Sequence, residues 1–222
     1  ALITNVAIQK TTFKYEIPYM LLITAVLLVM GMTGNEITFI EGVILWVLFI
    51  AYLLYLYFLA KKGNDSGDEQ PVKLYPVWKC LLFIVLGGVC VVIGSQLVVN
   101  GATTIARACG MSERFIGLTI VAFGTSLPEL VTSVSAARKG NAGIAIGNIV
   151  GSNIFNILFV IGTVALICPV PFESRFVIDT VVAILCGVLL WGGTIRHKEL
   201  RKPCGVVMLL CYAAYFVYLA AM

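Results

Sequence analysis

Long apolar segments recur along the whole chain and constrain its fold more than any other feature. A helix needs about 20 apolar residues to cross roughly 30 Å of hydrocarbon. Seven segments close to or above that length follow one another: 17–32, 38–60, 78–105, 115–137, 144–168, 176–194 and 204–221. Because lipid offers the backbone no hydrogen bonds, such segments form helices that satisfy their own N–H and C=O groups. The sequence therefore predicts an all-α, polytopic membrane protein with about seven transmembrane helices.

The distribution of charge supports this class and predicts an orientation. Only 12% of the 222 residues are charged, about half the share found in soluble globular domains. Twelve of the 15 Lys and Arg residues fall in alternate loops on one side of the predicted bundle, and the positive-inside rule makes that side cytoplasmic. The net charge of +4 is scattered over these loops, so we expect no nucleic-acid partner. We predict a multi-pass integral protein of an inner or plasma membrane.

A weak internal repeat links the two ends of the chain. Matching residues recur at an offset of 163, and one step away Ala1-Leu2-Ile3 matches residues 165–167. The matches at 163 are Glu16 with Asp179, Glu36 with Glu199, Gly42 with Gly205, Tyr52 with Tyr215 and Tyr55 with Tyr218. Internal symmetry of this kind is typical of transporter repeats.

The repeat divides the chain into three parts. Residues 1–60 are the last two spans of a first repeat, 61–76 form a cytoplasmic linker, and 77–222 form a second repeat of five spans. An odd number of spans inverts one copy relative to the other. We therefore expect a ten-helix transporter of five plus five spans, in which three further N-terminal helices partner the present ones.

A glutamate stands inside the otherwise uncharged segment 115–137. Placing a charge near the bilayer centre costs at least about 2.5 kcal/mol on insertion scales, so Glu129 is functional by default. Pro128 has no N–H and leaves the carbonyl of Gly124 without its helical donor. Hard oxygen ligands for a cation are therefore concentrated in residues 122–129; those with side chains are Thr125, Ser126 and Glu129.

A second group of polar residues occupies the next span, within residues 147–156. Asn148, Ser152 and Asn156 recur every four residues, which places them on one face of a helix. The connection to the previous span is short, so the two helices are expected to be antiparallel neighbours whose polar groups meet near the midplane. The alternative is a tightly packed pair of helices whose amides bond only across their interface.

These motifs resemble a known family. The run from Gly124 to Glu129 (GTSLPE), followed by Gly147-Asn148 and by the run from Gly151 to Asn156 (GSNIFN), resembles the second alpha repeat of the sodium/calcium exchanger family, within the cation/calcium exchanger superfamily. The resemblance is close over residues 77–170 and looser over the rest. It implies a secondary-active antiporter that exchanges calcium for sodium by alternating access at a midplane site.

The resemblance also implies the ligands of the transported ions. These are the carboxylate of Glu129, oxygens of Thr125, Ser126, Ser152 and Asn156, and the backbone carbonyl of Ala122, with Asn148 and Asn153 as secondary candidates. Many family members have Asp in place of Asn156, and the amide supplies an oxygen without a charge. The family places a second such glutamate in the first repeat. The coupling ion, sodium or proton, is therefore left open.

Three alternatives remain beside a sodium-coupled exchanger. One is a proton-coupled exchanger in which Glu129 itself is protonated, and another is a passive cation channel. The third is an intramembrane hydrolase with Ser126 as nucleophile, which needs a base within hydrogen-bond reach. The single histidine, His197, stands among basic residues of a loop. We expect no enzyme activity and no cofactor, with calcium and sodium ions as the transported ligands.

Overall fold

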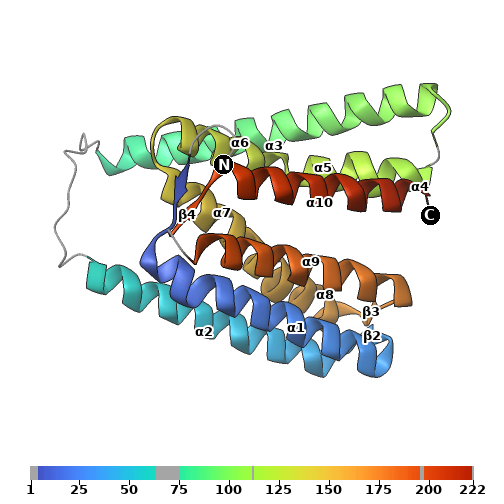
Figure 1. Ribbon diagram of the computed structural model, residues 1–222, viewed down its shortest axis with the longest axis horizontal. Helices are drawn as coiled ribbons and strands as arrows, with labels where there is room; N and C mark the ends of the chain where they lie inside the picture. Colours follow the sequence, from blue (N-terminus) through green and yellow to red (C-terminus); the bar gives the residue numbers. More distant parts are fainter. Residues whose placement is uncertain (1–4, 64–75, 112, 196–197, 222) are drawn as a thin grey trace. The chain divides into compact units, whose positions relative to one another are not determined.

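The computed structural model describes residues 5–63, 76–111, 113–195 and 198–221 (Figure 1). The match of Ala1-Leu2-Ile3 with 165–167, most of the predicted linker and His197 lie outside these residues.

All seven predicted spans are helical in the structure. Five of them are single helices: α1 (Ile17–Gly34), α2 (Phe39–Gly63), α3 (Val77–Ala108), α9 (Ser174–Thr194) and α10 (Lys202–Ala221). The longest is α3, which covers the third span. The described residues contain six helices long and apolar enough to cross a membrane, or up to seven if a bent pair counts as one span. The predicted all-α, multi-pass architecture is confirmed.

The fourth and fifth spans are composite. The fourth consists of α4 (Glu113–Ile116), the π-helix η2 (Gly117–Val121), α5 (Ala122–Thr125) and α6 (Leu127–Arg138). The fifth consists of α7 (Ala142–Phe155), the π-helix η3 (Asn156–Ile161) and α8 (Gly162–Ile167). A further π-helix, η1 (Thr12–Glu16), runs into α1. Turns of π-helix are rare and are frequently found at functional sites.

The chain forms two compact units. One contains Ala1–Ser66 and Ser133–Cys211, and the other contains Gly67–Thr132 and Tyr212–Met222. These units cut across the division at the linker, because α7, α8 and α9 from the second predicted repeat pack against α1 and α2 from the first. The assignment of 1–60, 61–76 and 77–222 to repeat, linker and repeat stays a prediction.

Two short antiparallel sheets in the first unit share one pattern. β1 (Val6–Ala7) pairs with β4 (Glu199–Leu200), and β2 (Glu36–Ile37) pairs with β3 (Val170–Pro171). Shifts of 163 or 164 residues carry β1 onto β3 and β2 onto β4, as in the sequence repeat. The same shifts carry the pair Val6 and Leu200 of one sheet onto the pair Val170 and Ile37 of the other. Each sheet thus joins two segments that the sequence repeat relates, in an equivalent register.

Small residues bring α2 and α8 close together. A Cβ on Gly42 would lie 3.0 Å from the Cβ of Ala165, and one on Gly162 would lie 3.2 Å from the Cβ of Leu45. Trp46 Nε1 donates to Thr163 Oγ1 at 3.3 Å beside this contact. Small residues are the usual means of close helix packing in membranes, where no hydrophobic effect draws helices together. The fully buried side chains of the unit include Ile17, Ile23, Leu45, Val150, Ile154 and Leu158.

Gly31 of α1 provides a test of this packing. A Cβ there would overlap the ring of Phe172, which is itself buried. We expect Gly31→Ala to destabilise the protein by about 1–3 kcal/mol, the usual range for overpacking. The measurement is the thermal denaturation of the purified protein in detergent.

Gly34→Ala is the matched control on the same helix, because a Cβ at Gly34 would meet no atom within 4 Å. That change removes a glycine from a helix and is expected to be neutral or stabilising by up to about 1 kcal/mol. Equal stability of the two variants would contradict the packing described for Gly31.

Candidate functional site

The helix of the fourth span is interrupted at Ser126. The segments Thr119–Thr125 and Leu127–Arg138 are bent by 49° relative to each other. Ser126 leaves the helical region, with φ −93° and ψ 0°. Its N–H donates to the carbonyl of Phe123 at 3.1 Å, a step of three residues where an α-helix uses four. The break follows from the sequence, because Pro128 has no N–H to continue the hydrogen-bond ladder.

The break changes the use of two carbonyl groups. The carbonyl of Ala122, which would accept from Ser126 in a continuous helix, accepts from the Thr125 hydroxyl at 2.9 Å. The carbonyl of Gly124 has no N–H to receive from Pro128. Carbonyls at the end of an interrupted helix are the groups with which transporters coordinate monovalent cations. These oxygens therefore suit a cation such as sodium.

Glu129 lies in the first turn of α6, directly after the break, and is half-buried. A carboxylate in this position is stabilised by the positive end of the helix dipole. The following turn is bonded to the same segment, because the Thr132 hydroxyl donates to the carbonyls of Pro128 at 2.8 Å and of Glu129 at 3.0 Å. The structure thus places Ala122, Thr125, Ser126 and Glu129 around one break in the second unit.

The other predicted ligands lie on α7 and η3 in the first unit. Ser152 Oγ donates to the carbonyl of Ile149 at 3.1 Å, and Asn153 Nδ2 donates to the same carbonyl at 2.8 Å. Asn156 is the first residue of η3, and its side chain is exposed. Each of these side chains keeps oxygen lone pairs for a ligand. That Glu129 and Asn156 bind one ion together stays a prediction.

Asn148 has a different environment. Its Nδ2 donates to Ser133 Oγ on α6 at 3.2 Å, and Ser133 Oγ donates to the carbonyl of Ala145 at 3.4 Å. Ser133 is buried, and it lies one turn after Glu129 on the same helix face. These bonds confirm that α6 and α7 are neighbours, as their short connection predicts. The amide nitrogen of Asn148 thus bonds across the helix interface, as the packing alternative describes, and its role as a ligand stays a prediction.

No group of three or more His, Cys, Asp or Glu side chains gathers to hold a metal ion within the part of the chain that the structure describes. A cation bound here would rely on one carboxylate and on neutral oxygens. That donor set favours hard ions such as calcium and sodium.

Comparison with known proteins identifies the family of this chain. The family model described as "Sodium/calcium exchanger protein" matches residues 79–221. CaxA of Alkalimonas amylolytica is 35% identical over 97% of this chain and 70% of its own length. The sodium/calcium exchanger MaX1 of Methanosarcina acetivorans is 38% identical over 64% of this chain and 41% of its own length. Among solved structures, the sodium-calcium exchanger NCX_Mj matches with a TM-score of 0.78 and 31% identity, over 99% of this chain and 69% of that chain.

The chain belongs to the sodium/calcium exchanger family. This confirms the resemblance drawn from the two motifs and makes the protein a member of a transporter family, a cation antiporter of the calcium-exchanger class. The chain spans about 70% of the length of the exchanger whose structure it resembles.

The structure also shows features of this exchanger-family chain that the sequence motifs do not reveal. Both motif spans contain a π-helix, η2 just before the break and η3 beginning at Asn156. No residue pattern in the sequence predicts these π-helical turns. The motifs also do not include Ser133, although a hydroxyl four residues after Glu129 in an apolar span is a signal of a polar contact.

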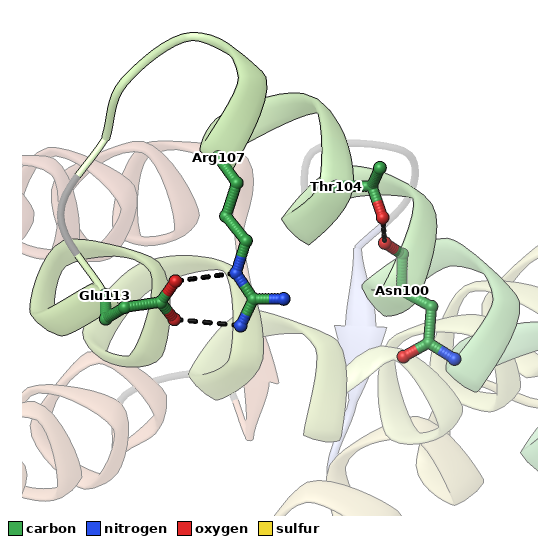
Figure 2. Close-up of polar contacts among 4 residues, drawn as sticks. All are labelled: Asn100, Thr104, Arg107 and Glu113. Atoms are coloured by element: carbon green, nitrogen blue, oxygen red, sulfur yellow. Dashed lines mark hydrogen bonds and ion pairs between the residues drawn. The ribbon is translucent and has the colours of Figure 1, made fainter.

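An ion pair closes the connection between α3 and α4, at the start of the broken span (Figure 2). Arg107 donates to both carboxylate oxygens of Glu113, from Nε at 2.6 Å and from the terminal nitrogen at 2.9 Å. The preceding turn of α3 carries a second bond, from the Thr104 hydroxyl to the carbonyl of Asn100 at 2.8 Å. The hydrogen bonds from Arg107 lower the pKa of Glu113. Both charged groups are exposed, so the pair orients this connection more than it stabilises the fold.

The Ser133–Asn148 bond leads to a prediction. We expect Ser133→Ala, Asn148→Ala and the double variant to show a coupling energy of about 0.6–1.7 kcal/mol, the range of polar contacts between membrane helices. The measurement is a double-mutant cycle of unfolding free energies for the purified protein. Strictly additive effects would contradict a direct bond.

Proposed function

We propose that this protein exchanges calcium for sodium across its membrane by alternating access. The observation that carries the proposal is the break at Ser126, beside which Glu129 and the carbonyls of Ala122 and Gly124 stand within one candidate membrane span. Family membership supports it, because the relatives MaX1 and NCX_Mj are named as sodium/calcium exchangers. The protein's activity as a whole is part of the proposal.

Calcium takes six to eight oxygen ligands at about 2.3–2.6 Å and tolerates irregular geometry. We assign it Glu129 as the charged ligand, with neutral oxygens from Thr125, Ser126, Ser152 and Asn156. Sodium is also a hard cation, and the Ala122 carbonyl is the additional oxygen that we assign to it. Both ions thus use overlapping ligands, so binding of one excludes the other and the two are exchanged.

We assign Asn148 and Asn153 lesser roles. The amide nitrogen of Asn148 is bonded to Ser133, and that of Asn153 is bonded within its own helix. Asn148 therefore positions α7 against α6, and Asn153 supports the turn that carries Ser152. Their carbonyl oxygens supplement the ligands listed above.

Glu129→Gln is the central test. The amide keeps the shape of the side chain and removes the charge that offsets the dehydration of a divalent ion in a low-dielectric site. Ligand charge tunes the calcium affinity of oxygen sites over several orders of magnitude, so we expect exchange to fall by more than about tenfold. The measurement is the uptake of radioactive calcium by proteoliposomes that contain the full-length protein, driven by an outward sodium gradient.

Glu113→Gln is the control, because it removes the same charge from an exposed position on the same segment. We expect its transport to equal that of the unmodified protein. Undiminished uptake by Glu129→Gln would overturn the site. Uptake driven by a pH gradient and indifferent to sodium would make the protein a proton-coupled exchanger, and uptake that needs no counter-ion would make it a channel.

Asn156→Asp tests the ligands on the next span. If Asn156 contributes an oxygen to the site, a carboxylate there adds charge to the same cluster and strengthens calcium binding. We expect the calcium concentration for half-maximal uptake to fall several-fold, with a steeper inhibition by sodium. Asn141→Asp, at the exposed N-cap position of the helix α7 that leads to Asn156, is the matched control. Equal effects of both changes would mean that they act through the general potential of the helix.

A further inference from the structure

A cavity of about 280 Å³ is lined by residues of η1, α1 and α2 in the first unit, away from the two exchanger motifs in sequence. Four tyrosines, one alanine and one carboxylate line it: Tyr15, Glu16, Tyr19, Ala51, Tyr52 and Tyr55. The four tyrosine rings form a chain of contacts. Tyr19 stacks on Tyr52 with ring centroids 5.6 Å apart, Tyr52 stacks on Tyr55 at 6.2 Å, and Tyr15 is tilted against Tyr55 at 6.1 Å.

The lining has the chemistry of an ammonium site. Aromatic faces attract cations through the ring quadrupole, and a carboxylate adds a full opposite charge. The hydroxyl of Tyr55 is buried and has no hydrogen-bond partner among residues whose positions are described. A buried polar group without a partner costs about 1–3 kcal/mol, so a ligand that bonds to this oxygen is favoured. Tyr19, by contrast, already donates to the carbonyl of Leu48 at 2.8 Å.

The partners of the cavity distinguish between kinds of ammonium group. Glu16 accepts hydrogen bonds, and the Tyr55 oxygen accepts one as well. A primary ammonium group has three N–H donors for these acceptors, whereas a quaternary ammonium group has none. The cavity therefore favours a primary amine over its methylated counterpart.

The depth of the cavity suggests the source of that amine. Glu16 lies four residues after the start of the candidate membrane span Thr12–Gly34. Lys14 Nζ lies over the ring of Tyr15, 5.3 Å from its centroid, so a second cation stands beside the cavity. Lys14 offers a cation for a phosphate, and Glu16 offers an acceptor for an ammonium group. A phosphate and an ammonium group are the two charges of one zwitterionic lipid headgroup. We propose that this cavity binds the headgroup of an ethanolamine phospholipid.

The internal repeat carries part of this lining a second time. The offset of 163 places Asp179, Ala214, Tyr215 and Tyr218 at the positions of Glu16, Ala51, Tyr52 and Tyr55. The rings of Tyr215 and Tyr218 stack at 6.3 Å and 27°, much as those of Tyr52 and Tyr55 do at 6.2 Å and 25°.

The test measures lipid binding to the purified full-length protein and does not depend on ion exchange. Delipidated protein in detergent is titrated with phosphatidylethanolamine, with its N-methyl and N,N-dimethyl forms, and with phosphatidylcholine, all with the same acyl chains. Native mass spectrometry reports binding, and the thermal midpoint reports stabilisation. We expect the affinity to fall at each methylation, with at least tenfold between the first and last lipid.

Variants of the cavity make the test specific. Glu16→Gln and Tyr52→Leu are expected to lower the affinity for phosphatidylethanolamine at least tenfold, whereas Tyr52→Phe keeps the ring face and is expected to bind nearly normally. Glu36→Gln, which removes an exposed charge in β2, beyond the far end of α1, is the control and is expected to have no effect. If Tyr52→Leu does not fold, Glu16→Gln and the methylation series decide the outcome.

Two results would overturn the proposal. One is equal affinity for phosphatidylethanolamine and phosphatidylcholine, or an unchanged affinity in Glu16→Gln, which would mean that the cavity is filled by protein or left to water. The other is equal affinity for soluble glycerophosphoethanolamine and for the intact lipid, which would mean that the ligand is a soluble amine.

Discussion

The missing hydrogen bond at Pro128 is the interaction on which the candidate site depends. Hydrocarbon supplies no substitute for a lost backbone donor, so a proline in a membrane span must be accommodated by nearby polar groups. Here the helix ends at Thr125 and begins again at Leu127, with a bend of 49° between the two segments. The end of one helix releases carbonyl oxygens, and the start of the next stabilises the carboxylate of Glu129. One imino acid thus brings backbone carbonyls and a carboxylate together at a single break, which is the arrangement on which the proposed site rests.

The scaffold of the first unit follows a second constraint, the pairing of segments that the sequence repeat relates. Both small sheets join a strand of one copy to a strand of the other, in registers that the repeat interconverts. Close contacts of α1 with α9 and of α2 with α8 accompany them. Glycines at these contacts let backbones approach, which is where membrane proteins gain packing energy. Equivalent surfaces related by a repeat are suited to alternating access, because an arrangement that opens one face has a counterpart for the other.

The tyrosine-lined cavity shows how such a repeat can keep a feature that the transport motif does not use. Glu16 and Asp179 stand at matching positions, as do the tyrosine pairs of α2 and α10. A carboxylate at the start of a span would be stabilised by the helix dipole wherever it occurred. The adjoining rings and the buried Tyr55 hydroxyl go beyond that requirement. They indicate a ligand rather than a helix cap.

The sequence alone determined the class, the helices and the chemistry of the candidate site. Apolar length and the hydrogen-bond demands of lipid leave no other fold for the seven spans, and Pro128 beside Glu129 announces a broken helix. The shared motifs identify the family. Only the tertiary structure showed that Asn148 is bonded to Ser133 and that π-helical turns flank both motifs. It also showed that four tyrosines and Glu16 line one cavity. These features depend on how helices distant in sequence are rotated against one another, and the periodicity of a single helix does not contain that information.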